Sequence, residues 1–338
     1  MTDLTKIVDL HIHSSASDGY HPPEELHKIV QASAKQLAAD GLELGVTSLT
    51  DHDTLLGLDR MQALCDGGPV RFLPGVELDG DFDGSATHLL VYFPSWNDAT
   101  RSRIKRVLLP MVEEISRSMD AVISQTMVER VNACGNIRLI PRERITSQTV
   151  RGLVEQEDAQ YDTDLKAFRA AKWAAVGRLM LQCGYVESME EMRRHLKPGG
   201  CCKCEDVQVP LPYTVDDLIQ RLRGNGFVLF LAHPSTVVES LAAGRFSGDM
   251  EKGMHEFVGQ ILRWQEMGLD GIECYSSHSE QDCPIQDFEA RMLSLCAKNA
   301  LWVSGGSDFH GGGKKEKVGV GFGALRVPFE AIRPWYGE

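Results

Sequence analysis

Two histidines lie two residues apart near the start of the chain, inside an apolar, β-branched segment at residues 7–13. Alternate side chains of an extended strand share one face, so the imidazoles of His11 and His13 can bind one metal ion. The pair alone is weak evidence, because chance surface pairs of this kind are commoner than metal sites. The pair indicates a metal site only if other predicted strands also contain residue types that bind metal ions.

Residue types that bind metal ions recur at those other segments. Six of the eleven histidines are candidate ligands that fall in a strand-like segment, and acidic residues accompany them. In parallel α/β folds, side chains at the carboxyl ends of strands converge on one site even when the strands are distant in sequence. We therefore expect a single metal centre. The candidate ligands are His11, His13, Asp18, His52, Glu77, His88, His233, Asp308 and His310.

Short apolar segments alternate with helical patterns along most of the chain. One helix is expected after His21, where Pro22 and Pro23 precede apolar residues at helical spacing, and another near Thr214. Such alternation predicts an α/β fold with a parallel sheet or barrel. The expected strands lie within residues 7–13, 44–53, 71–80, 87–93, 227–234, 270–279 and 300–310.

The middle of the chain has a different pattern. It lacks comparable strand motifs, and its apolar residues recur at helical spacing over residues 104–123, 167–184 and 188–196. We therefore predict an α/β domain interrupted by a helical insertion. The predicted parts are a first barrel segment at 1–98, the insertion at 99–198 and a second barrel segment at 199–338.

The insertion is expected to roof the metal pocket. His88 precedes it and His233 follows it, and both flanking strands must place their ligands at the same mouth. Its basic side chains are therefore candidates for contacting an anionic substrate. They are Lys172, Arg169 and Arg178.

Composition excludes several classes of function. The 338 residues, 43% of them hydrophobic, can build a sizeable core, and the formal net charge of -13 argues against an extended nucleic-acid surface. No run of about 18 or more apolar residues suggests a membrane span, and the first residues do not resemble an export signal. We expect a cytoplasmic protein.

The nine cysteines are irregularly spaced and predict thiols rather than a disulfide framework. Cys201, Cys202 and Cys204 form a dense group that, with Cys183, could bind a soft metal ion. A structural zinc site normally pairs two ligand couples, so a loop that happens to carry thiols is the favoured interpretation. The role of the group stays undecided from sequence.

Taken together, the motifs resemble the PHP (polymerase and histidinol phosphatase) phosphoesterases over about residues 1–95 and 205–325. The segments Gly271-Ile272-Glu273 and Ser277-His278-Ser279 favour the branch of stand-alone nucleotide phosphatases. The resemblance implies a distorted (β/α)7 TIM-like barrel with a helical insertion. The motifs, in order, are His11-x-His13, Asp18-Gly19, Thr50-Asp51-His52-Asp53, Gly75-Val76-Glu77, His88, Ala232-His233-Pro234 and Ser307-Asp308-Phe309-His310.

The resemblance also implies two or three divalent metal ions in three ligand groups. Manganese, iron and zinc all suit mixed imidazole and carboxylate ligands, and sequence does not choose among them. Asp51 and Asp53 are interpreted as partners that orient His52, or as helix caps. The implied groups are His11, His13, Glu77 and Asp308; then His88 and His233, with Glu77 bridging; then Asp18, His52 and His310.

The activity implied is hydrolysis of a phosphate monoester by a metal-bridging hydroxide, with no serine or cysteine nucleophile. Glu77 and Asp308 are then catalytic as ligands, and His278 could donate to a phosphoryl oxygen or protonate the leaving group. Substrates of this branch are nucleotides, nucleoside 3',5'-bisphosphates and short RNA ends. The Arg-x-His cluster common in its insertion is not intact here, where residues 172–175 read Lys-Trp-Ala-Ala.

Three alternatives remain at this stage. The first is a histidinol-phosphate-type phosphatase, and the second is metal-dependent amide hydrolysis on a related barrel. The third is a non-catalytic PHP module, which is disfavoured because all nine candidate ligands are present. Assays of phosphate release against ammonia release separate a phosphoesterase from an amide hydrolase.

Overall fold

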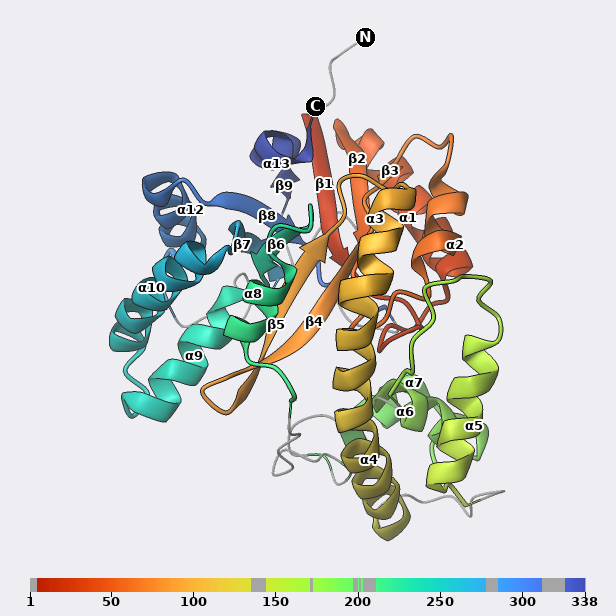
Figure 1. Ribbon diagram of the computed structural model, residues 1–338. Helices are drawn as coiled ribbons and strands as arrows, with labels where there is room; N and C mark the ends of the chain where they lie inside the picture. Colours follow the sequence, from red (N-terminus) through yellow and green to blue (C-terminus); the bar gives the residue numbers. More distant parts are fainter. Residues whose placement is uncertain are drawn as a thin grey trace.

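The computed structural model describes residues 5–134, 144–170, 173–196, 200, 202, 211–277, 285–311 and 326–337, and Figure 1 shows its elements. Nine strands of the described part form two sheets, of orders β3-β2-β1-β9 and β4-β5-β6-β7-β8. The first sheet consists of β1 (Thr5–Ile12), β2 (Leu42–Leu49), β3 (Arg71–Phe72) and β9 (Val327–Pro328). The second consists of β4 (Gly75–Phe82), β5 (Ser85–Tyr92), β6 (Val228–Leu231), β7 (Gly271–Ser276) and β8 (Trp302–Gly306).

Both sheets mix parallel and antiparallel pairs, whereas a parallel sheet was predicted. β4 and β5 form an antiparallel hairpin in which Asp79 lies opposite His88. Asp83 and Gly84 at its turn have φ of 57° and 77°, the positive values that tight hairpin turns need. His88 therefore lies within its strand and not at the strand start that the sequence pattern suggested.

The two sheets approach each other without closing into one barrel. β1 lies beside β8 and β2 beside β4, and isolated bridges join Ile12 to Phe309 and His52 to Glu77. No continuous ladder joins the sheets in the described ranges, so the predicted TIM-like barrel is not confirmed and the fold is mixed α/β. At one of these edges Asp308 has φ of 52°, which takes the chain out of strand geometry.

Helices cover the sheets where the sequence patterns placed them. The predicted helix after His21 is α1, which begins at Pro23 and buries Leu26 and Val30. Thr214 caps α8, its hydroxyl accepting the backbone N–H of Asp217. The helices around the sheets are α1 (Pro23–Ala39), α2 (Leu58–Cys65), α8 (Val215–Leu222), α9 (Pro234–Arg245), α10 (Met250–Met267), α12 (Phe288–Asn299) and α13 (Phe329–Tyr336).

The described part of residues 99–198 contains helices and holds no strand. Figure 1 shows α5, α6 and α7 grouped beyond the strand ends, with the long α4 leading to them. The helical pattern predicted from residue 167 is wrong at its start, because residues 161–170 are not helical and α6 begins only at Trp173. The elements are α3 (Asp98–Arg103), η1 (Ile104–Leu108), α4 (Leu109–Ala133), α5 (Ser147–Asp158), α6 (Trp173–Gln182) and α7 (Met189–Leu196).

The cysteines correct one sequence prediction. Cys134 is disulfide-bonded, so the expectation of thiols alone is wrong there. Cys202 and Cys183 are buried, and no group of possible metal ligands in the described chain includes a cysteine. Cys201 and Cys204 lie outside the described residues. Separately, none of the helices in the described ranges combines the length and apolarity needed to cross a membrane.

Candidate metal centre

The end of β1 carries the first two candidate ligands, and both are fully buried. His11 Nε2 lies 3.0 Å from Glu77 Oε2, and His13 Nε2 lies 3.1 Å from Asp308 Oδ1 and 3.3 Å from the same Glu77 oxygen. Ligand atoms of all four side chains lie within 4.8 Å of one another. The structure thus brings together the four residues that the sequence grouped around one ion.

The second oxygen of Glu77 faces a different pair of histidines. Glu77 Oε1 lies 3.0 Å from both His88 Nδ1 and His233 Nε2, and those two nitrogens are 3.1 Å apart. One carboxylate therefore has one oxygen directed at the β1 histidines and the other directed at this pair. A carboxylate placed in this way can bridge two ions.

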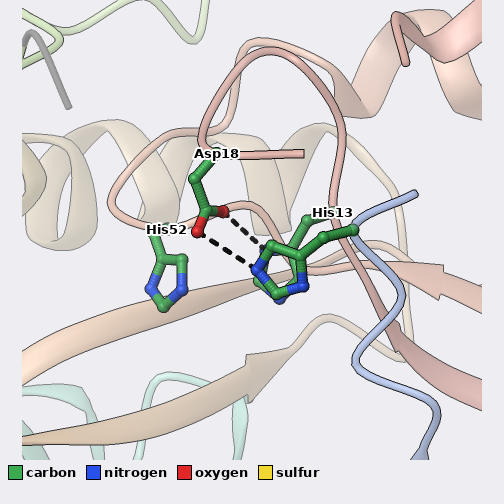
Figure 2. A group of neighbouring side chains, drawn as sticks. His13, Asp18 and His52 are labelled. Atoms are coloured by element: carbon green, nitrogen blue, oxygen red, sulfur yellow. Dashed lines mark hydrogen bonds and ion pairs between the residues drawn. The ribbon is translucent and has the colours of Figure 1, made fainter. Parts of the chain in front are cut away.

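A third group lies on the other side of His13. Asp18 Oδ2 is 3.1 Å from His310 Nε2, and Asp18 Oδ1 is 3.8 Å from His13 Nδ1. Figure 2 shows the Asp18 carboxylate directed at the His13 ring, with His52 beside it. The His52 ring stacks on His13 at 4.8 Å between ring centroids, and His52 Nε2 lies 3.3 Å from Glu77 Oε2. His52 thus borders both the third group and Glu77.

Local backbone geometry places two of these side chains. His233 has φ of 25° and ψ of 67° at the start of α9, between β6 and Pro234. Its backbone N–H donates to Glu273 Oε2 at 2.6 Å. Asp308 also has positive φ. Residues other than glycine occupy this region at a cost in energy that surrounding contacts must offset, and such residues cluster at functional sites.

Glu273 and Asp79 are two supporting carboxylates to which the sequence motifs assigned no role. Glu273 is fully buried, and its Oε1 lies 2.8 Å from His11 Nδ1. Asp79 Oδ1 lies 3.1 Å from His52 Nδ1 and 3.5 Å from His88 Nε2. Carboxylates that accept from the far nitrogen of an imidazole fix its tautomer and orientation.

Both carboxylates had a sequence signal. Asp79 lies two residues after Glu77 in β4 and therefore shares its face of the strand. Glu273 is part of the segment Gly271-Ile272-Glu273, which favours the branch of nucleotide phosphatases but does not indicate what its carboxylate contacts. The period-2 pattern could have found Asp79, whereas the contacts of Glu273 could not be read from the sequence.

Asp51 and Asp53 do not cap helices, which was one of the two roles that the sequence suggested. Asp51 accepts hydrogen bonds from the backbone N–H and hydroxyl of Ser14 at 2.7 and 2.6 Å, and from the hydroxyl of Ser17 at 2.6 Å. Asp53 Oδ1 accepts from the backbone N–H of Asp79 at 3.0 Å. Asp51 therefore holds the loop before Asp18, and neither residue is a helix cap.

The electrostatics of the centre favour a cation. Burial and the nearby His310 lower the pKa of His13 to about 3, which leaves that imidazole neutral. Burial alone would raise the pKa of Glu77, but His52 and His11 hold it well below its usual value. Burial opposes the charged form of His11 also, yet Glu77 and other carboxylates raise its pKa well above the ordinary value. A divalent cation could replace the proton that this raised pKa retains.

One orphaned atom supports the fit of a metal ion. His13 Nδ1 is buried and has no hydrogen-bond partner, although it faces Asp18. Buried polar atoms are rarely left without a partner. Imidazole and carboxylate donors converging in this way suit manganese, iron or zinc.

The candidate substrate contacts are placed differently from the ligands. Arg169 was expected to meet the substrate, but its side chain is 5% exposed and pairs with Glu157 and Asp158 at 2.8 and 2.7 Å. Arg178 is paired with both oxygens of Glu157 at 2.7 and 2.8 Å. Lys172 and His278 lie outside the described residues. Among the described candidates, Arg178 keeps more exposure than Arg169.

An exposed aromatic residue, Tyr20, is joined through its backbone to the third ligand group. Tyr20, two residues after Asp18, is 41% exposed and is one of two exposed large hydrophobic residues in the described chain. Its backbone N–H donates to the carbonyl of His310 at 2.8 Å, and its ring meets His21 edge-on with centroids 4.9 Å apart. Sequence reasoning missed this residue. An exposed ring at such a place can stack on a planar group.

Comparison with known proteins identifies related enzymes, although no family model matches the chain. A 5'-3' exoribonuclease of Haemophilus influenzae is 33% identical over 311 residues, which cover 91% of each chain. A 3',5'-nucleoside bisphosphate phosphatase of Chromobacterium violaceum is 25% identical over 315 residues, covering 91% of this chain and 88% of the relative.

The fold has a counterpart among solved structures. A protein from Bifidobacterium adolescentis, assigned as a metal-dependent phosphoesterase, aligns with a TM-score of 0.63 at 20% identity. The alignment covers 98% of this chain and 95% of that one. At this identity, the likeness establishes the fold, including its helical part, and not the substrate.

Proposed function

Because the chain belongs to the PHP family of metal-dependent phosphoesterases, we propose that its substrate is a phosphate monoester of a nucleotide, a nucleoside 3',5'-bisphosphate or a short RNA end. It is a hydrolase of phosphoric ester bonds, as its named relatives are. The proposal about the substrate rests on the two relatives, one of which acts on RNA and the other on a bisphosphate.

The position of Glu77 supports the proposed chemistry most strongly. Its two oxygens face two separate sets of histidines at 3.0 to 3.3 Å. Divalent ions held there would lower the pKa of a bound water and withdraw charge from the phosphoryl oxygens. The proposed ligands are His11, His13, Glu77, Asp308, His88, His233, Asp18, His52 and His310.

The chain's own residues orient these ligands. Glu273 holds the His11 ring and the backbone of His233 together, and Asp79 contacts His52 and His88. Ligand donors that are fixed before a metal ion or substrate arrives need little rearrangement during the reaction. His278 is kept as a proposed donor to the leaving group.

Recognition of the leaving group is proposed to involve Tyr20. A nucleobase stacked on an aromatic ring gains about 1 to 3 kcal/mol per base without regard to its identity. Tyr20 is exposed and is tied to Asp18 and His310 by the chain and by its backbone hydrogen bond. A small non-nucleotide ester such as histidinol phosphate lacks a purine or pyrimidine to stack there.

A substrate screen tests the proposal. Release of phosphate and of mononucleotides would be measured with Mn²⁺ on nucleoside 5'-monophosphates, nucleoside 3',5'-bisphosphates, 5'-phosphorylated oligoribonucleotides, histidinol phosphate and para-nitrophenyl phosphate. We expect one nucleotide class to exceed histidinol phosphate by at least about tenfold in kcat/KM, a difference of roughly 1.4 kcal/mol. Preference for histidinol phosphate would overturn the proposed substrate class, and no release with manganese, iron or zinc would overturn the assigned chemistry.

A further inference from the structure

A non-helical segment of the insertion runs along the first part of the α/β domain. This strap, residues 159–170, connects α5 to the segment before α6. Leu165 within it is fully buried. The hydroxyl of Thr163 donates to Asp59 in α2 at 2.6 Å, and Asp164 pairs with Arg101 and Lys105. The strap is therefore fastened to helices outside it.

Two further strap residues reach the loop that carries a proposed ligand. We define the Asp18 loop as residues 14–18. Arg169 donates from Nη1 to the carbonyl of Ala16 at 3.0 Å. The Tyr161 phenol lies near the Ser15 side chain, and burial raises the pKa of Tyr161 above its usual value. The insertion thus contacts the Asp18 loop through a cation and a phenol.

The guanidinium of Arg169 is committed to this contact. Glu157 and Asp158 at the end of α5 hold its Nη2 and Nε, so its charge is matched within the insertion. Ala16 is its one partner outside the insertion among the described residues. A buried arginine that is hydrogen-bonded on all sides is costly to disturb and holds its partners in place.

The opposite side of the Asp18 loop is equally constrained. Asp51 accepts three hydrogen bonds from Ser14 and Ser17. Gly19, directly after the loop, leaves no room for a side chain, because a Cβ there would lie 2.4 Å from the carbonyl oxygen of His13. The loop is therefore held between Asp51 and the strap, and Asp18 leaves it toward His310 and His13.

We propose that the strap is a positioning element for the metal centre, in which Arg169 and Tyr161 hold the Asp18 loop where Asp18 meets His13 and His310. Binding of an ion by Asp18, His52 and His310 then depends on docking of the insertion. This inference rests on the proposed role of Asp18 as a metal ligand. Arg169 acts through Asp18 and does not touch the substrate.

Manganese binding by the full chain tests the inference independently of turnover. Equilibrium dialysis with elemental analysis would compare wild type, Arg169→Ala, Arg169→Lys and Asp18→Asn. We expect Arg169→Ala to lower the affinity for one manganese ion per chain by at least about tenfold, as Asp18→Asn should. The other ions should bind as in wild type. Arg169→Lys should restore part of the affinity because it keeps the cation near Ala16.

The matched control is Arg178→Ala. It removes the other guanidinium from Glu157 but contacts no residue of the Asp18 loop, so its manganese binding should equal that of wild type. If Arg169→Ala fails to fold, Tyr161→Phe removes the hydroxyl near Ser15 with the ring retained and should weaken binding of the same ion by a few fold.

The outcomes are distinguishable. Loss of the same ion in Arg169→Ala and Asp18→Asn supports the inference. Wild-type binding by Arg169→Ala and Tyr161→Phe, with the ion lost in Asp18→Asn, would overturn it and leave the proposed function intact. No change in Asp18→Asn would instead show that Asp18 is not a ligand, and both the ligand assignment and the inference would fail.

Discussion

Acidic residues have different partners in the strand-derived centre and in the helical insertion. Among the described residues, the partners of Glu77 are histidines, and those of Glu273 are a histidine ring and a backbone N–H. In the insertion, Glu157 is paired with two guanidiniums, those of Arg169 and Arg178. The carboxylate in the insertion is therefore paired with guanidiniums, which are always charged. The carboxylates in the centre face imidazoles, which can lose their proton and become neutral.

This difference separates a structural use of charge from a chemical one. An ion pair between an arginine and a carboxylate holds helices together, and its carboxylate is already engaged and does not bind a metal ion. Imidazoles and carboxylates without a fixed cation offer lone pairs to an incoming metal ion. The centre should therefore respond to metal ions and the insertion should not. The following substitutions test that contrast.

Glu77→Gln should have the largest effect on activity. An amide cannot supply two anionic oxygens to two sets of histidines, so kcat should fall by at least about 100-fold. Circular dichroism and thermal melting should show a folded protein, because the rigid strands remain. Turnover near the wild-type rate would mean that Glu77 does not hold the ions.

Glu273→Gln should be the next most damaging change. It weakens the acceptor for His11 Nδ1 and for the backbone of His233, and loss of such outer contacts typically costs about 10- to 100-fold in metal affinity or activity. Metal titrations would measure the affinity. Glu251→Gln, on an exposed carboxylate paired with Arg291, is the matched control and should change nothing. An equal response of both variants would argue against an orienting role.

Tyr20→Ala tests which region of the protein recognises the leaving group. Stacking lost from a base should reduce kcat/KM on the preferred nucleotide by roughly tenfold or more, and reduce it much less on para-nitrophenyl phosphate. Arg178→Ala should lower both by less than about threefold, because Glu157 already neutralises that guanidinium. If kcat/KM on the nucleotide alone falls more in Arg178→Ala than in Tyr20→Ala, the insertion and not Tyr20 recognises the leaving group.

Glu157→Gln should have the smallest effect on turnover. Removing the carboxylate leaves two guanidiniums without their shared partner, so unfolding free energy should drop by about 1 to 2 kcal/mol, discounted for the partial exposure of the pair. Denaturant unfolding measures this. Ions held by the Glu77 groups should bind normally. A loss of those ions would break the contrast between the two regions.

The ligand residues could be predicted because each one is a metal-binding residue type in or beside a segment that the sequence marks as a strand. His11 and His13 follow the strand period, and each other candidate stands at a strand or in the turn beside one, so side chains separated by up to 297 residues along the chain, as His11 and Asp308 are, could be expected to meet. In the structure eight of the nine candidates fall into three overlapping groups, and the ninth, His233, contacts Glu77 and His88.

Other features depended on contacts that a sequence does not display. The Asp83-Gly84 turn is a hairpin signal, but the surrounding βα alternation favoured a parallel pair and hid it. Residues 167–170 have helical spacing, yet they are not helical in a segment where Arg169 bonds Glu157, Asp158 and Ala16. Tertiary contacts of this kind override local propensity.

Metal reconstitution tests the central claim most directly. The protein would be stripped with a chelator, titrated with Mn²⁺, and followed at once for ions bound per chain and for phosphate released from a nucleoside 3',5'-bisphosphate. We expect no release from the stripped protein and recovery in step with the binding of two or three ions per chain. Full activity with fewer than about one ion per chain would contradict the account.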